Sequence, residues 1–351
     1  MKSLLLTLLA AARTAAACSH LSELNTTFAA LPATAHGLAL NAAGYAVQAF
    51  GGGAYMVTDG SYQNVFFVST AGVILVDLPP TIGTNVLYAI GNVTTLPVTH
   101  LVYSHAHADH IGAAALVAGA GGSGSGSAVV EIVAHADTKE LLQEVADPLR
   151  PLPTTTFEEQ LTLRVGNQTL ELRYEGENHA RGNIFIYAPV QKLLVLIDVV
   201  FPGWVPFAQL AVSSNVPGWI AAHDKVLAYD FTYYVGGHLG RAGTRDDVVL
   251  QKQYVADLFE NCKSAINLSA TVDPVLGAAA LIGEVESRNP GNKWADFRGY
   301  LAVVAEYCGN VTADKWVGRL GAADVWGYEN AFMMVERLRL DYNVLGPFRN
   351  T

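Results

Sequence analysis

The sequence predicts a layered α/β fold with a helical C-terminal region. Short apolar runs rich in Val, Ile, Phe and Tyr recur between turn signals, and helix-like stretches separate some of them. The strand signal fades after about residue 245, where apolar positions take helical spacing. With 351 residues, 51% hydrophobic and 15% charged, the chain can bury a substantial core. Strands interleaved with helices indicate a mixed, layered core.

The first residues have the layout of a secretory signal peptide. Lys2 precedes an apolar run over 4–12, and three alanines at 15–17 precede Cys18. The run is shorter than the about 20 residues of a membrane-spanning helix. We therefore expect a signal peptide over 1–17, no stable membrane span and a secreted protein. Five N-x-Ser/Thr sequons also favour export and glycosylation: Asn25, Asn92, Asn167, Asn267 and Asn310.

The central part of the chain carries the strand and helix patterns. The predicted strands cover residues 64–69, 72–77, 100–103, 129–133, 169–174, 183–187, 192–198 and 231–235. The predicted helices cover residues 81–91, 111–119, 137–146 and 217–228. The segment GAGGSGSGS at 119–127 has the composition of a surface loop. These elements belong to one predicted domain over 18–245.

Residues 246–351 are predicted to form a helical extension packed on that domain. Thr244 precedes an amphipathic stretch over 246–266, where it can act as an N-cap. The extension either stabilises the core by packing on it or lines one wall of a pocket. Cys262 and Cys308 both lie in it, and they form either a disulfide or two buried thiols.

The charge balance narrows the classes of partner. The formal net charge of −10 opposes the electrostatic attraction by which nucleic-acid-binding proteins hold phosphates. We expect a small-molecule substrate and no nucleic-acid partner.

One short segment, SHAHADHIG at 104–112, concentrates residues that bind metals. His105 and His107 are spaced by one residue after a predicted strand, so they point the same way in an extended chain. Asp109 and His110 lie where the chain turns into a helix and project in another direction. Zinc accepts neutral imidazoles and carboxylates, and burying four such groups without a metal would cost much desolvation free energy. The segment predicts ligands for two metal ions, against the alternative of a purely structural cluster.

Three more candidate ligands come at the ends of predicted strands. They are His179 in GENHARGN, Asp198 in KLLVLID and His238 in VGGHLG. Side chains at strand ends converge at one edge of a sheet, where binding sites are usually built. Taken singly, His238 can be a turn residue and Asp198 a helix cap or turn former.

The sequence HAHADH at 105–110, followed by the later His, Asp and His, resembles the signature of the metallo-β-lactamase fold superfamily. The resemblance runs from about Asn64 to Gly243. It implies an αββα sandwich with a dinuclear metal site at one edge. GVILVD also resembles the superfamily's early strand, whose final aspartate, Asp77 here, would support the metal loop without binding metal.

The resemblance assigns the seven residues to two zinc ions, with iron or manganese as alternative metals. The first ion would be held by His105, His107 and His179, the second by Asp109, His110 and His238, and both by Asp198. Glyoxalase II-like thioesterases and lactonases have such a bridging aspartate, whereas true β-lactamases of this fold do not. The resemblance therefore favours a thioesterase or lactonase over a true β-lactamase.

The expected activity is hydrolysis of a small acyl substrate, which means a lactone, ester, thioester or amide. A hydroxide bridging the two metals would attack the carbonyl, and Asp109 would act as the catalytic residue that orients it. The alternatives are a mononuclear iron oxidoreductase of the sulfur dioxygenase kind, a true β-lactamase, and a catalytically idle metal-binding protein.

An aromatic loop, VVFPGWVPF, follows Asp198 directly. Its side chains Phe201, Trp204 and Phe207 form a candidate substrate-pocket wall, because small-molecule sites are mostly apolar. The other interpretation is a loop packed against the C-terminal helices.

Overall fold

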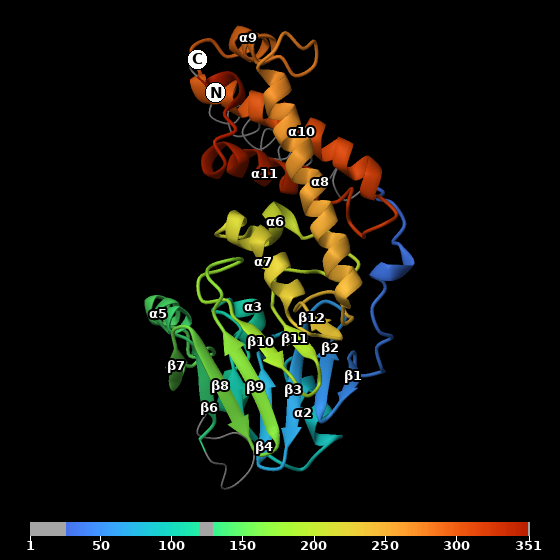
Figure 1. Cartoon of the computed structure of the whole chain (residues 1–351), viewed down its shortest axis with the longest axis vertical. Coiled ribbons are helices and arrows are strands. Elements are labelled where there is room, and N and C mark those ends of the chain that lie inside the picture. Colours follow the sequence, from blue (N-terminus) through green and yellow to red (C-terminus); the bar gives the residue numbers. More distant parts are fainter. Residues whose placement is uncertain (1–25, 119–128, 350–351) are drawn as a thin grey trace, which may run out of the picture. The chain divides into compact units, whose positions relative to one another are not determined.

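A computed structural model describes residues 26–118 and 129–349 (Figure 1). Residues 31–351 form one compact unit, and residues 1–30 are assigned to another. Within the first thirty residues only 26–30 are described, and they form neither helix nor strand. The predicted signal peptide at 1–17, Cys18, Asn25 and the predicted loop at 119–127 lie outside the described residues.

Two β-sheets form the centre of the larger unit. The first has seven strands in chain order, namely β1 (Ala46–Gly51), β2 (Ala54–Thr58), β3 (Gln63–Ser69), β4 (Gly72–Val76), β5 (Val98–Val102), β6 (Glu131–His135) and β7 (Thr155–Phe157). The second has the order β12 (Tyr233–Val235), β11 (Leu193–Val195), β10 (Phe185–Ala188), β9 (Gln168–Arg173) and β8 (Gln160–Val165). Strands β4 to β7 pair in parallel, as do β11 and β12, and the other pairs are antiparallel.

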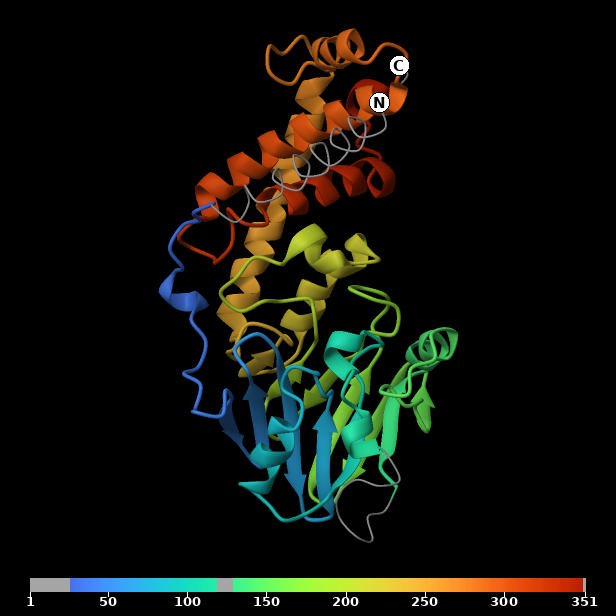
Figure 2. The ribbon, with the colours of Figure 1, turned by 180° about the vertical axis from the view of Figure 1, so that it is seen from behind.

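Helices α2 (Asn85–Gly91), α3 (Ala108–Ile111), α4 (Ala115–Ala118) and α5 (Ala136–Glu144) pack on the outer side of the first sheet (Figure 2). Helices α6 (Ala208–Val212) and α7 (Val216–Ala228) contribute to the apolar cluster that contains Phe185 of the second sheet. Strand β3 illustrates the layers: Val65 and Phe67 pack between the sheets, whereas Phe66 packs on the outer side with Val86 of α2. Alternate residues of a strand point to opposite faces, so one strand serves two core layers. The layered α/β prediction and the αββα sandwich are confirmed.

The C-terminal region is helical, as predicted. It contains α8 (Arg245–Ser269), α9 (Ala278–Arg288), α10 (Lys293–Trp316) and α11 (Gly327–Asp341), and short 3-10 turns lie at η2 (Ala33–Ala35) and η3 (Gly346–Phe348). The amide of Thr244 donates to the Asp247 carboxylate at the start of α8. One apolar cluster joins Phe185 of the second sheet, Trp219 of α7 and Tyr300 of α10. The helices therefore share a continuous core with the sandwich.

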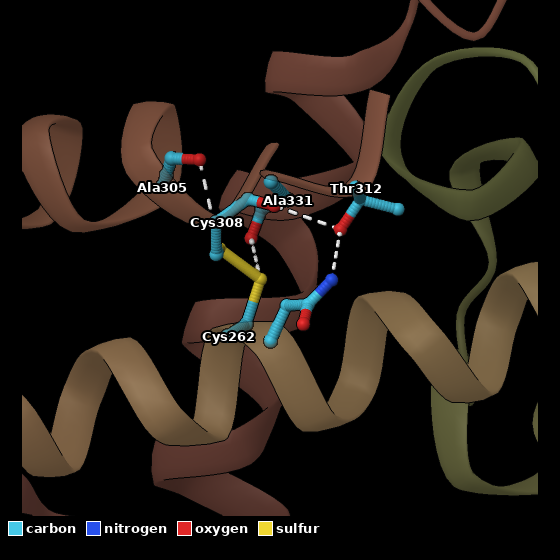
Figure 3. The surroundings of a disulfide bond; sticks show 6 residues. Cys262, Ala305, Cys308, Thr312 and Ala331 are labelled. Carbon is cyan, nitrogen blue, oxygen red and sulfur yellow. Dashed lines mark hydrogen bonds between the residues drawn. A yellow bond between two sulfur atoms is a disulfide. The ribbon is translucent and has the colours of Figure 1, made fainter. Parts of the chain in front are cut away.

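A disulfide between Cys262 and Cys308 connects α8 to α10 (Figure 3). Both residues are fully buried, and their Cα atoms lie 4.9 Å apart. Of the two states that the sequence left open, the structure contains the bridge.

The segment over α6 has an uncommon backbone. Gln209, Leu210 and Ala211 have φ angles of 57°, 55° and 61°, and Val212 follows at 51°, so the chain makes a left-handed turn without glycine. Each such residue costs about 1 to 2 kcal/mol. The turn is held by Asn330 of α11, which accepts a bond from the Leu210 amide at 2.7 Å and donates to a neighbouring carbonyl at 2.8 Å.

Some boundaries differ from the prediction. The helix expected over 111–119 is two short helices, α3 and α4, and α3 already begins at Ala108. Strands β1, β2, β7 and β8 were not predicted.

Among the described helices, none combines the length and the apolar character that a bilayer crossing requires.

Candidate metal centre

The seven predicted ligands converge at one edge of the sandwich. His105 and His107 lie in the loop after β5, and Asp109 and His110 lie in the first turn of α3. The other three follow strands of the second sheet: His179 follows β9, Asp198 follows β11 and His238 follows β12. The loops after several neighbouring strands thus place every candidate ligand in one location.

The ligand atoms form two groups. Within each group they lie within 4.8 Å of one another, and the groups are His105, His107, His179 and Asp198, and Asp109, His110 and His238. The Asp198 carboxylate lies between them. Its Oδ2 is 3.2 Å from Nε2 of both His179 and His110, and its Oδ1 is 3.0 Å from Nε2 of His238. One carboxylate therefore contacts ligands of both groups.

The donor set fits metal ions. Nε2 of His105 is buried with no hydrogen-bond partner in the described part of the chain, and the Asp198 carboxylate oxygen lies 3.7 Å from it. The nitrogens His107 Nδ1 and His179 Nε2 face each other at 3.0 Å. Inward-facing imidazole nitrogens around a carboxylate are the ligands that zinc prefers.

The electrostatics of the cluster favour neutral imidazoles on one side. Burial lowers the pKa of His105 well below its ordinary value and lowers that of His179 to about 4. Burial also opposes a charge on His110, but the carboxylates of Asp198, Asp109 and Asp77 outweigh it and raise its pKa to about 9. Burial would raise the pKa of Asp198, yet the surrounding imidazoles hold it well below its usual range.

Polar side chains behind the cluster hold the backbone of the loop that begins at Ser104. The Ser104 amide donates to Oδ1 of Asp77 at 2.8 Å, and Ser104 Oγ lies 2.9 Å from Nδ1 of His105. Asp77 is fully buried, and burial raises its pKa to about 6. The side chain of Gln63 donates to the carbonyl of His238. Asp77 thus stands behind the ligands, where the resemblance placed it.

Tyr62 is a site residue to which the sequence assigned no role. It lies between β2 and β3, and its hydroxyl donates to Oδ2 of Asp109 at 3.3 Å. Its ring lies 4.5 Å from that of His238. Burial, followed by the Asp109 charge, raises the pKa of Tyr62 to about 12, so the phenol stays a donor at neutral pH. An isolated antiparallel β-bridge between Tyr62 and His238 places Tyr62 beside the cluster. No local sequence motif indicates this contact.

The aromatic loop divides between two environments. The rings of Phe201 and Phe207 lie 5.8 Å and 5.9 Å from the ring of His238, and Phe207 is partly exposed. Trp204 is engaged elsewhere. Its indole N–H donates to the carbonyl of Ala35, and its ring covers Gly321. The two phenylalanines are therefore the residues of this loop that flank the cluster.

A family model described as the metallo-beta-lactamase superfamily matches residues 58–238, a span that contains all seven clustered residues. Among solved structures, a metallo-beta-lactamase from Pontibacter korlensis superposes with a TM-score of 0.50 at 21% sequence identity, covering 60% of this chain and 97% of that one. At this identity the likeness concerns the fold alone.

One relative of known activity has a name that describes another reaction. The chain is 28% identical over 199 residues to the 2,4-dinitroanisole O-demethylase subunit alpha of Nocardioides sp. (strain JS1661). The match covers 56% of this chain, and the chain spans 58% of the length of that relative.

Proposed function

The chain belongs to the metallo-beta-lactamase superfamily, and on this premise we propose that it is a dinuclear zinc hydrolase of a small acyl substrate. The observation that carries the proposal is the position of Asp198, whose two oxygens lie 3.0 Å from His238 and 3.2 Å from His179. A carboxylate that faces two groups of imidazoles would be placed to serve both metal ions. His105, His107 and His179 would hold one ion, and Asp109, His110 and His238 the other.

Two bound zinc ions would supply a Lewis acid for the acyl oxygen and a water whose pKa falls from 15.7 to about 7. The chain's own residues position the reactants. The side chain of Asp109 is 43% exposed, so it can orient an attacking water from the open side. The Tyr62 hydroxyl holds this carboxylate.

We propose that the substrate is apolar near the reacting bond. Phe207 is partly exposed beside His238, and Phe201 supports it from the core at a ring separation of 5.8 Å. Aromatic walls with a few polar groups favour small apolar ligands. The substrate classes we propose are lactones, esters, thioesters and amides.

The relative from Nocardioides supports a second candidate reaction. Its name describes demethylation of 2,4-dinitroanisole, an electron-poor aromatic ether. The same site could present water to the ether-bearing ring carbon of such a compound, because that carbon is electrophilic like an acyl carbon. We propose this ether cleavage as the second candidate.

The test combines metal analysis with a substrate panel. The purified chain would be analysed for zinc, iron and manganese, then incubated with a lactone, an ester, a thioester, an amide, a β-lactam and 2,4-dinitroanisole. We expect about two zinc ions per chain and turnover of an acyl substrate. Asp109→Ala is the control, and it should lose turnover while staying folded.

Each of the other outcomes would favour a different function for this protein. One iron per chain with oxygen consumption would favour an oxidoreductase, and release of dinitrophenol alone would favour ether cleavage. Turnover of the β-lactam alone would contradict the ranking, and a metal-free chain would refute a metal-dependent reaction.

We also propose that the protein is secreted and glycosylated. The sequon residues Asn92, Asn167, Asn267 and Asn310 are all exposed. The disulfide supports an oxidising compartment. Expression in a eukaryotic secretory host should yield protein in the medium whose mass falls after enzymatic removal of N-glycans. Unmodified, intracellular protein would contradict this proposal.

A further inference from the structure

The turn that carries Asp198 is held by side chains from α7, from α8 and from the neighbouring strand β12. The Asp198 carbonyl accepts a bond from the indole N–H of Trp219 at 3.0 Å. Gln251 of α8 binds the next residues twice: its Nε2 donates to the Val199 carbonyl at 2.7 Å, and its Oε1 accepts from the Phe201 amide at 2.7 Å. Gln251 is fully buried, so these bonds have no competition from water.

A third contact completes the turn. The Val200 amide donates to the hydroxyl of Tyr234 at 3.3 Å, and that hydroxyl donates to the Leu196 carbonyl at 2.6 Å. Side chains from α7, β12 and α8 therefore bind the backbone along 198–201.

His223 of α7 fixes the orientation of the Gln251 amide. Its Nδ1 lies 3.2 Å from the carbonyls of Trp219 and Ile220, so Nδ1 carries the proton. Nε2 is then an acceptor, 3.0 Å from the Gln251 nitrogen. Burial lowers the pKa of His223 to about 4, which keeps this acceptor neutral. The amide of Gln251 consequently points its oxygen at Phe201.

Asp198 needs this support because its backbone is left-handed. Its φ angle is 63°, a conformation that persists in a non-glycine residue only when the surroundings determine it. A change in the following backbone would rotate the carboxylate away from His179 and His238.

We propose that Gln251 is a positioning residue of the metal centre: helix α8 fixes residues 199–201 and thereby aims the Asp198 carboxylate. The inference rests on the proposed metal centre. It gives the C-terminal helices a part in the chemistry, because one of them holds a ligand in place without touching metal or substrate.

The test compares zinc affinity with stability. Gln251→Met keeps the volume and removes both backbone bonds. Thr312→Val is the matched control, since Thr312 is buried in α10 and its hydroxyl donates to the Cys308 carbonyl at 2.7 Å. Zinc dissociation constants would be measured by competition with a chromophoric chelator, and melting temperatures would be measured on the metal-free chains.

We expect Gln251→Met to weaken zinc binding by about 10- to 100-fold, and Thr312→Val to change it by less than about twofold at a similar loss of melting temperature. Gln251→Glu keeps the acceptor for the Phe201 amide and should recover part of the affinity. Zinc binding of Gln251→Met at wild-type strength, or an equal loss in Thr312→Val, would overturn the inference.

If Gln251→Met does not fold, the zinc affinity of Gln251→Glu tests the inference. This variant lacks the bond to Val199, so a wild-type zinc affinity would also overturn the inference. A wild-type chain that binds no zinc would instead refute the proposed function.

Discussion

The hydroxyl of Tyr62 donates a hydrogen bond of 3.3 Å to Oδ2 of Asp109. A residue between β2 and β3 thereby restrains the carboxylate proposed to orient water. We predict that Tyr62→Phe lowers kcat by about 10- to 100-fold, because residues that orient a ligand carboxylate typically contribute this much. Steady-state kinetics on the substrate found in the panel would measure it.

Tyr187→Phe is the matched control for that experiment. The Tyr187 hydroxyl also donates a hydrogen bond, to the Asp230 carbonyl at 2.7 Å, but at the surface. The control should leave kcat unchanged. If Tyr62→Phe keeps wild-type kcat and raises only KM, the hydroxyl contacts substrate and does not serve Asp109.

The buried His223 makes stability depend on pH. Its pKa is lowered to about 4 by burial, whereas the unfolded imidazole titrates near 6.5. Below pH 6.5 the unfolded chain binds the extra proton, so stability is complete above 6.5 and declines as pH falls toward 4. At about 1.4 kcal/mol for each factor of ten, the decline is about 3 kcal/mol. Its charged neighbours Asp224 and Lys252 pair with each other at the surface.

Urea unfolding of wild type and His223→Gln at about pH 7.5 and about pH 4.5 would isolate this contribution. The variant keeps an acceptor for Gln251 and has no imidazole there. We expect its free energy of unfolding to fall by about 3 kcal/mol less than that of wild type over this interval. Parallel losses in both proteins would assign the pH dependence to other histidines.

The Cys262–Cys308 bridge should stabilise the helical region through the unfolded chain. It closes a loop of 46 residues, for which loop entropy gives about 4 kcal/mol. We predict that Cys262→Ala with Cys308→Ala lowers the free energy of unfolding by about this amount. A reducing agent should destabilise wild type and leave the double variant unaffected. An unchanged wild type under reduction would show that the bridge contributes nothing.

The left-handed turn over Gln209–Val212 depends on Asn330. The substitution Asn330→Leu would leave the amide of Leu210 and the carbonyl of Pro206 buried without these hydrogen-bond partners. We expect a loss of about 2 to 4 kcal/mol in unfolding free energy. KM for an apolar substrate should also rise, because the turn follows Phe207. Asn330→Asp keeps the acceptor for the Leu210 amide, so its free energy of unfolding should fall by less. Equal decreases in both variants would contradict this account.

Much of the fold could be predicted because its signals are local. Strands such as β3, β4 and β9 are apolar runs between turns, and α7 and α8 have helical spacing. Strand β8 was not predicted, although its residues alternate between exposed and buried positions. This two-residue periodicity is the signal by which the strand could have been recognised. Strands β1 and β2 meet at glycines 51–53, and this turn composition obscured the hairpin.

Four of the candidate ligands could be predicted because they lie within one short motif at 105–110, and the other three because each comes at the end of a predicted strand. Gln251, Tyr62 and Asn330 could not, since each acts across a long stretch of sequence and a lone amide or phenol has no periodic signal. The left-handed turn was equally hidden. The residues AQLAV contain neither glycine nor asparagine, and by propensity alone they favour a right-handed helix.

The apolar cluster that runs from the second sheet into α8, α10 and α11 limits how this scaffold can be recombined. A chimaera that joined residues before 245 to the helices of a relative would pair mismatched core surfaces under the turn of Asp198. Directed evolution toward new substrates should therefore randomise the helices together with the loops, since a change of shape in α8 would reach the ligands through Gln251.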